Sequence, residues 1–319
     1  MKPTTSHRTY PKSRPSAPFP AHIAEELHRY DEHLRDARGL SSGTRKDRIY
    51  VAGLLLRQKF NGCAIDISKL RTGDIRQFLA KQLEANRSTS NASHYTGALR
   101  SYLRYRATCG DSVGELTAVI QNPVHWKLAS LPRALAPDEI ERLLDSFTTR
   151  HRWPKRSYAI IRCALDLGLR SGEIASLKIS DIDWRAGTVT LKGTKTLRQD
   201  ILPLPMETGQ ALADYLQHER PLSTSNSVFV MHRGDHDRGM TADDVRGVIR
   251  WAYKRIGLKH TRSHALRHAF ACRLIERGSS LKEVADLLRH RSLNSTLIYA
   301  KLDTPKLAAV ALPWPGSAA

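Results

Sequence analysis

A run of turn-forming residues between positions 110 and 133 divides this 319-residue chain into two parts. Glycines and prolines interrupt any regular helix or strand there, at Gly110, Gly114, Asn122-Pro123 and Leu131-Pro132. Pro137 then stands at a first helical position with acidic residues in the first turn, which indicates a new domain. The length is enough for two cores. We therefore predict a disordered basic arm (1–20), a helical domain (21–110), a linker (111–133), a second domain (134–303) and a tail (304–319).

The first domain is predicted to be a bundle of four helices. Apolar residues recur every three or four positions in the first helix, at Leu27, Tyr30 and Leu34. A second helix begins near Arg45, and two more are expected at about 72–84 and 92–107. We find little sign of a strand in this part of the chain.

The second domain is predicted to combine helices with a short hairpin. An apolar helix is expected at 155–167, and further helices at about 206–218, from Thr241 to 256 and from Ser280 to His290. The β-like runs 188–191 and 201–204 flank a lysine-bearing tip, and 228–230 is expected to be another strand. The fold class is therefore mainly α with a small antiparallel β-sheet.

Positive charge is spread over both halves of the chain. The formal net charge is +20, and residues 1–128 and 129–319 each carry +10. This distribution favours two domains that bind one nucleic acid, although a cation-rich surface could have no such partner. Cations near the start of the second helix oppose its dipole and suggest a phosphate contact. The candidate DNA-binding residues are Arg45, Lys46 and Arg48 there, and Arg100 and Arg104 in the fourth helix.

The composition argues against several other classes of protein. The four cysteines, at 63, 109, 163 and 272, are too far apart for a zinc ribbon or a disulfide framework, so buried thiols in a reducing compartment are expected. No apolar run is long enough for a membrane span, and no secretory signal is recognisable. We therefore expect a cytoplasmic protein associated with nucleoid DNA, without a membrane partner.

The window from Arg262 to Lys301 holds the densest set of reactive side chains: His264, Arg267, His268, His290 and Tyr299. Zinc binding by His264 and His268 lacks the glutamate of a metalloprotease motif and an obvious third ligand. A serine-hydrolase elbow and a Walker loop are also missing. A structural role for His290 and Tyr299 in the core remains open. No metal and no cofactor are expected.

A tyrosine hydroxyl can attack a phosphodiester directly, without a metal. Its pKa near 10 means that it needs help to lose its proton. Arginine and imidazole groups can neutralise the charge of the transition state. A lysine at the tip of a hairpin can protonate the departing 5′ oxygen. The chain contains each of these groups.

Four segments resemble the motifs of the tyrosine recombinase (phage integrase) family, in the same order and at similar spacing. They are Leu167–Glu173, Gly193–Leu197, His264–His268, and Leu288–Ser292 followed by Tyr299 nine residues after His290. Position 289 is an arginine where many members of the family have glycine. The likeness extends from about residue 20 to 302.

The resemblance implies a role for each matching residue. Tyr299 would be the nucleophile, Arg170 and Arg267 would bind the scissile phosphate, and His264 and His290 would assist. Glu173 would support Arg170. Lys195 would be the general acid, with Lys192 as the alternative, and His268 would serve packing or hydrogen bonding. Substitutions at Arg170 should be as damaging as substitutions at Arg267.

The resemblance also implies an architecture and a reaction. A helical core-binding domain and a catalytic domain would form a C-shaped clamp around double-stranded DNA, and a homo-tetramer would act on two DNA sites. Strands would be exchanged through a 3′-phosphotyrosyl intermediate and a Holliday junction, with the tail contacting a neighbouring subunit. Relaxation of DNA by a type IB topoisomerase-like enzyme and DNA binding without catalysis are the alternatives. Phage integration, transposition of a mobile element and dimer resolution are not distinguished.

Overall fold

The computed structural model describes residues 18–85, 89–122, 134–148, 151–192, 199–258, 263–290 and 295–302. These residues group into two compact units, one within Met1–Trp126 and the other within Lys127–Ala319. Most of the predicted arm and all of the predicted tail lie outside the described residues.

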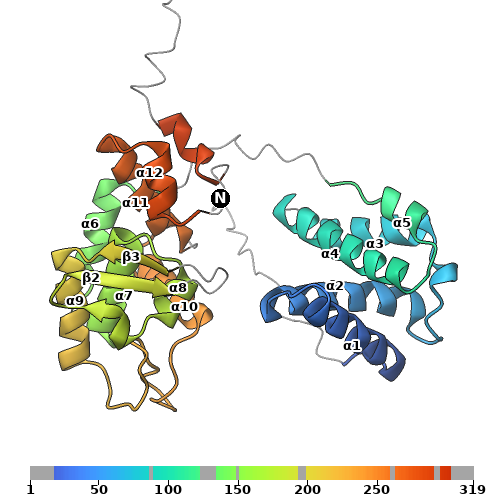
Figure 1. Cartoon of the computed structure of the whole chain (residues 1–319), viewed down its shortest axis with the longest axis horizontal. Helices are drawn as coiled ribbons and strands as arrows, with labels where there is room; N and C mark the ends of the chain where they lie inside the picture. The colour runs from blue at the N-terminus through green and yellow to red at the C-terminus, as the bar shows by residue number, and fades with distance from the viewer. Residues whose placement is uncertain are drawn as a thin grey trace, which may run out of the picture. The chain divides into compact units, whose positions relative to one another are not determined.

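The first unit is helical, as predicted. Its elements are α1 (Ala21–Asp36), α2 (Ser42–Phe60), the short 3₁₀ helix η1 (Ile67–Lys69), α3 (Thr72–Ala85), α4 (Thr89–Thr108) and α5 (Gly114–Ala118). Helix α2 packs against both α1 and α4 (Figure 1). Leu27, Tyr30 and Leu34 all lie in the core of this unit, which confirms the helical periodicity read from α1.

Helix α5 lies inside the stretch 111–133 that we expected to be a linker. Val113, Leu116 and Ile120 are buried in the same core as α1, α2 and α4. The packed part of the first unit therefore continues beyond Gly110 to Ile120. Gly110 follows the end of α4 with a φ of 97°, a conformation that glycine adopts without strain.

The second unit is also mainly helical. Its helices are α6 (Pro137–Asp145), α7 (Pro154–Asp166), α8 (Ser171–Ser176), α9 (Met206–His218), α10 (Ala242–Arg255), α11 (His264–Glu276) and α12 (Leu281–Leu287), with the 3₁₀ turns η2 (Ile179–Asp181) and η4 (Leu297–Leu302). The apolar helix α7 is central and contacts α9, α10 and α11. Helices α10 and α12 begin where the sequence predicts them, after Thr241 and Ser280. Each of these side chains caps its helix by accepting a hydrogen bond from a backbone N–H three residues later.

The predicted hairpin is present and belongs to a three-stranded antiparallel sheet in the order β1-β2-β3 (Figure 1). The strands are β1 (Ile182–Asp183), β2 (Thr188–Lys192) and β3 (Gln199–Pro203), with Thr190 opposite Ile201. The prediction of a strand at 228–230 was wrong. These residues make only an isolated bridge, from Val230 to Gly239, and they are apolar because they are fully buried in the core.

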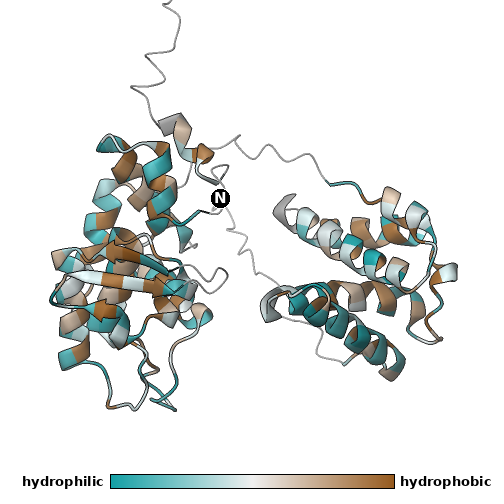
Figure 2. Cartoon of the chain, in the orientation of Figure 1, coloured by the Kyte–Doolittle hydropathy of each residue, from teal (hydrophilic) through white to brown (hydrophobic). Residues whose placement is uncertain are grey.

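Hydrophobic and hydrophilic residues are interleaved along the helices of both units (Figure 2). This pattern is typical of helices that pack one face against a core and expose the other. In the part of the chain that the structure describes, no helix is both long and apolar enough to cross a membrane.

Candidate active site

A tight turn after α7 brings Arg170 to the start of α8. Gly168 has a φ of 58°, and a Cβ atom there would lie 2.6 Å from the ring of Phe270. Glycine is therefore required for both conformation and space. Glu173, in the first turn of α8, accepts from the backbone N–H of Arg170 at 2.8 Å and from its Nη1 at 2.7 Å. The capping carboxylate thus also orients the guanidinium group of Arg170.

Helix α11 places the side chain of Arg267 near Glu173 and Arg170. Its side chain is only 5% exposed. One guanidinium nitrogen donates to the carbonyl of Gly168 and the other to the carbonyl of Leu288. Burial, together with the nearby charge of Arg170, lowers the pKa of Arg267 to about 9, still above neutral pH. Arg267 therefore links the turn after α7 to the end of α12, and its positive charge is poorly solvated.

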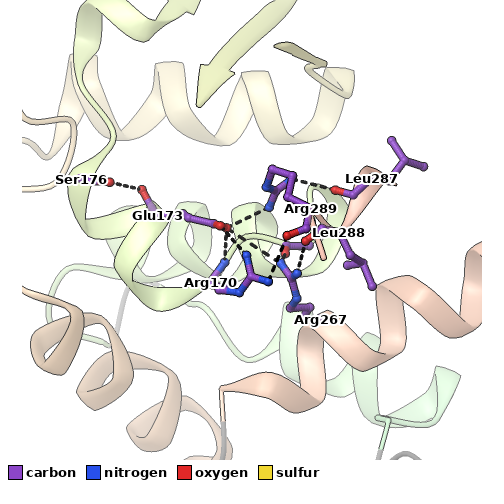
Figure 3. Close-up of polar contacts among 8 residues, drawn as sticks. Arg170, Glu173, Ser176, Arg267, Leu287, Leu288 and Arg289 are labelled. Carbon is purple, nitrogen blue, oxygen red and sulfur yellow. Dashed lines mark hydrogen bonds and ion pairs between the residues drawn. The ribbon is translucent and has the colours of Figure 1, made fainter. Parts of the chain in front are cut away.

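A third arginine reaches the same carboxylate, and we had not predicted it as a site residue. Nη2 of Arg289 donates to Glu173 at 2.8 Å, and Nη1 of Arg267 lies 3.9 Å from that oxygen (Figure 3). Burial by itself would raise the pKa of Glu173, but Arg289 and the hydrogen bond from Arg170 hold it below its usual value. Glu173 is therefore ionised and surrounded by guanidinium groups.

Tyr299 lies on η4 and is buried, with 1% of its surface exposed. It packs in a small cluster with Ala271 and Ile275 of α11 and Val284 of α12. Its hydroxyl lies 2.6 Å from Nδ1 of His268, one turn beyond His264 on α11. Burial raises the pKa of Tyr299 above its usual value, while the positive charge of Arg267 acts against this rise.

The three histidines of the window occupy different environments. His290 shares a hydrogen bond of 2.7 Å between Nδ1 and Oγ1 of Thr296, which links it to the segment that carries Tyr299. Burial, followed by the charges of Arg267 and Arg170, lowers the pKa of His290 to about 4. His264 is exposed at the start of α11. The site therefore contains neutral imidazole groups near pH 7.

These pKa shifts predict that the second unit loses stability in mild acid. Burial lowers the pKa values of His232, His268 and His290 from 6.5 to about 4. Between these values the unfolded chain binds more protons, so the stabilisation is complete above pH 6.5 and is lost as the pH falls towards 4. We expect the Tm to drop between pH 7 and 5. His232 is not one of the proposed site residues, and His232→Gln should make this drop in Tm smaller. An unchanged drop would contradict the lowered pKa of His232.

The described part of the chain contains one of the two candidate lysines of the hairpin. Lys195 lies outside the described residues. Lys192, at the end of β2, places Nζ 2.8 Å from Oδ1 of the buried Asp181. An ion pair with a buried carboxylate restrains Lys192 and gives it a structural role. The contact therefore favours Lys195 as the general acid, which stays a prediction.

The five cations predicted to bind DNA in the first unit are partly engaged in internal contacts. Arg45 pairs with Asp31 at 2.9 Å, and Arg48 donates to Ser101 of α4 at 2.9 Å. Arg100 donates to Oδ1 of Asn122 at 2.8 Å and to the carbonyl of Ile120. Lys46 and Arg104 are exposed. All five stay predictions as DNA contacts, and the two exposed cations are the most accessible.

The second unit gathers three arginines, Arg170, Arg267 and Arg289, around Glu173. The adjoining segments carry His290, His268 and Tyr299. Three guanidinium groups facing one carboxylate form a site for an added anion. The sequence showed no signal for the contact of Arg289 beyond its position next to His290.

The chain is similar to known proteins along most of its length. The models of the "Phage integrase family" and of the "Phage integrase, N-terminal SAM-like domain" match residues 133–305 and 27–108. The integrase/recombinase y4rA of Sinorhizobium fredii is 35% identical over 301 residues, which cover 94% of this chain and 73% of that protein.

Two solved structures share the fold. The Tn1549 transposon integrase in complex with transposon right end DNA has a TM-score of 0.67 and 18% identity, and the match covers 88% of this chain and 99% of that one. A lambda integrase tetramer bound to a Holliday junction has a TM-score of 0.65 and 19% identity, covering 85% of this chain and 77% of that one.

Proposed function

Because the chain belongs to the phage integrase family of tyrosine recombinases, we propose that it cuts and rejoins double-stranded DNA at specific sites through Tyr299. The observation that carries this proposal is the cluster of Arg170 and Arg267 around Glu173, in the same unit as the buried Tyr299. The surplus positive charge of this cluster suits a scissile phosphate.

In the proposed reaction the hydroxyl of Tyr299 attacks the scissile phosphorus and forms a 3′-phosphotyrosyl bond. Arg170 and Arg267 bind the non-bridging oxygens, and His264 and His290 assist binding and proton transfer. Lys195 protonates the departing 5′ oxygen. The covalent bond conserves the energy of the phosphodiester, so no nucleotide and no metal are required. Attack also requires Tyr299 to exchange its contact with His268 for the phosphate.

We further propose that the two units grip DNA together as a clamp and that four copies act on two DNA sites. Lambda integrase has been solved as a tetramer on a Holliday junction, which supports an exchange through such a junction here. The tail at 304–319 would contact a neighbouring subunit, and the arm at 1–20 would touch DNA phosphates. The transposon integrase among the similar structures keeps transposition and integration both open.

A suicide substrate tests the proposal. DNA fragments bound by the protein are identified by sequencing, and a nick is placed so that the cleaved end diffuses away and religation fails. We expect a covalent protein–DNA adduct with a 3′ linkage and a free 5′-hydroxyl, which polynucleotide kinase labels. Failure of the wild-type chain to form the adduct would overturn the proposal. Relaxation of plasmids that lack paired sites would instead favour the topoisomerase-like alternative.

Charge reversal at the exposed cations of the first unit should weaken DNA binding. Each phosphate contact contributes about 0.9 to the slope of log K against log salt. We expect Lys46→Glu and Arg104→Glu each to lower affinity about tenfold and to reduce the slope by roughly one. Lys69→Glu, on η1, is the matched control. The same loss in all three variants would argue for a general charge effect without a specific contact.

A further inference from the structure

Arg289 has a backbone conformation that most residues avoid. Its φ is 53°, and Trp153 is the other non-glycine residue with a positive φ in the described part of the chain. A left-handed conformation is strained for an ordinary side chain, and glycine escapes this strain. The family-like motif with glycine at this position is consistent with such a turn. An arginine here needs contacts that compensate for the strain.

Those contacts join the end of α12 to the start of α8. Nη1 of Arg289 donates to the carbonyl of Leu287 at 2.7 Å, and Nη2 donates to Oε2 of Glu173 at 2.8 Å. The side chain is 9% exposed. The backbone carbonyl of Arg289 in turn lies 3.5 Å from Nη2 of Arg170. Figure 3 shows the side chain of Arg289 reaching Glu173 beside Arg170 and Arg267.

The two oxygens of Glu173 are thereby divided between different arginines. Oε1 accepts from the guanidinium group of Arg170, whereas Oε2 accepts from Arg289 and from the backbone of Arg170. A carboxylate freed from Arg289 could take both donors of Arg170 in a bidentate pair. Such a pair would turn Arg170 towards Glu173 and away from a phosphate.

Arg289 also changes the charge of the site. With Arg170 and Arg267 alone, Glu173 would leave a formal surplus of one positive charge, and Arg289 raises the surplus to two. Arg267, Arg289 and Glu173 are largely buried, and buried charges interact more strongly than charges in water. The surplus therefore favours the developing negative charge of a phosphoryl transition state more than it favours DNA binding as a whole.

We propose that Arg289 is a positioning residue of the phosphate site, which holds Glu173 so that Arg170 stays available and adds the third positive charge. This inference rests on the proposed function, because it assigns Arg289 a part in the cleavage of DNA by Tyr299. Both terminal nitrogens of Arg289 are occupied by protein acceptors, so Arg289 acts through its hold on Glu173 and through its charge, without a hydrogen bond to the phosphate.

The test separates the chemical step from binding. Arg289→Gly removes the side chain and also relieves the left-handed backbone, so the variant should fold with a Tm close to that of the wild type. On a suicide substrate at saturating DNA we expect adduct formation to slow about 10- to 100-fold. In a Tyr299→Phe background, DNA affinity should change by less than about threefold. Arg289→Lys should recover part of the rate, because it restores a positive charge.

A double-mutant cycle with Glu173→Gln checks that Arg289 acts through this carboxylate. If it does, removing Arg289 should slow cleavage less in the Glu173→Gln background than in the wild type. If removing Arg289 slowed cleavage by the same factor in both backgrounds, or if Arg289→Gly cleaved at the wild-type rate, the role of Arg289 would be overturned. The proposed function of the chain would be unaffected by either result. If the wild-type chain forms no adduct, the proposed function fails and this role of Arg289 fails with it.

Discussion

Replacing Tyr299 with phenylalanine is expected to abolish the covalent protein–DNA adduct. The change removes one oxygen atom, which is the nucleophile of the proposed reaction. Tyr299 is buried, and the ring of phenylalanine fills the same space in the cluster of α11 and α12. The rate of adduct formation on a suicide substrate should fall by roughly 10⁴-fold or more, to below detection.

Tyr299→Phe should lose the cleavage step but keep its fold and its affinity for DNA. Tyr299→Phe also leaves Nδ1 of His268 without its partner, at a cost of about 1 kcal/mol, so the variant should remain folded and bind DNA. Tyr253→Phe is a matched control, because Tyr253 is a buried tyrosine of α10 in the same unit. It should form the adduct at the wild-type rate. An adduct formed by Tyr299→Phe would mean that another residue is the nucleophile.

If Tyr299 is the nucleophile, as proposed, its contact with His268 would keep the hydroxyl unreactive before DNA binds. The hydroxyl is buried, its pKa is raised, and a neutral imidazole holds it at 2.6 Å. A phenol in this environment is protonated near neutral pH and is a poor nucleophile. Movement of η4 towards Arg170 and Arg267 would strengthen the effect of the charge of Arg267, which already acts to lower the pKa of Tyr299.

Local patterns in the sequence were sufficient for most of the helices, although not for α5. The caps at Thr241 and Ser280 are local signals, and each one marks a helix that the structure contains. Gly168, two residues before Arg170, is a local signal of the turn into α8, because a Cβ atom there would collide with Phe270. Glu173 was expected to support Arg170, and its two hydrogen bonds to that residue agree with this expectation.

Contacts between distant segments could not be read in the same way. The strand β1 is two residues long, and its pairing with β2 depends on tertiary packing. Residues 228–230 resemble a strand because burial on all sides and a sheet select the same apolar residues. The interaction of Arg289 with Glu173 joins positions 116 apart in sequence, and no periodicity links them.

Arg170 and Arg267 should be equally important for cleavage but not for folding. Both are proposed to bind the scissile phosphate, and loss of either positive charge should slow adduct formation about 10³-fold. From the sequence, substitutions at the two positions were expected to be equally damaging. The structure separates them, because the side chain of Arg170 is 39% exposed whereas that of Arg267 is 5% exposed.

The difference should appear in thermal unfolding. Arg267→Ala leaves the buried carbonyls of Gly168 and Leu288 without their donor, and each lost partner costs about 1–3 kcal/mol. The removal of a poorly solvated charge offsets part of this cost, so we expect a net loss of about 2 kcal/mol and a Tm lower by roughly 4–8 °C. Arg170→Ala should lower the Tm by about 2 °C or less, because its ion pair is partly exposed.

Measuring both variants by calorimetry and on a suicide substrate decides between two accounts of Arg267. If Arg267 only joins the turn at Gly168 to the end of α12, cleavage should recover when the assay is run well below the Tm of the variant. If it also binds the phosphate, cleavage stays about 10³-fold slow even where Arg267→Ala is fully folded, as with Arg170→Ala. Recovery at low temperature for Arg267→Ala alone would leave Arg170 as the main phosphate ligand, supported through Glu173.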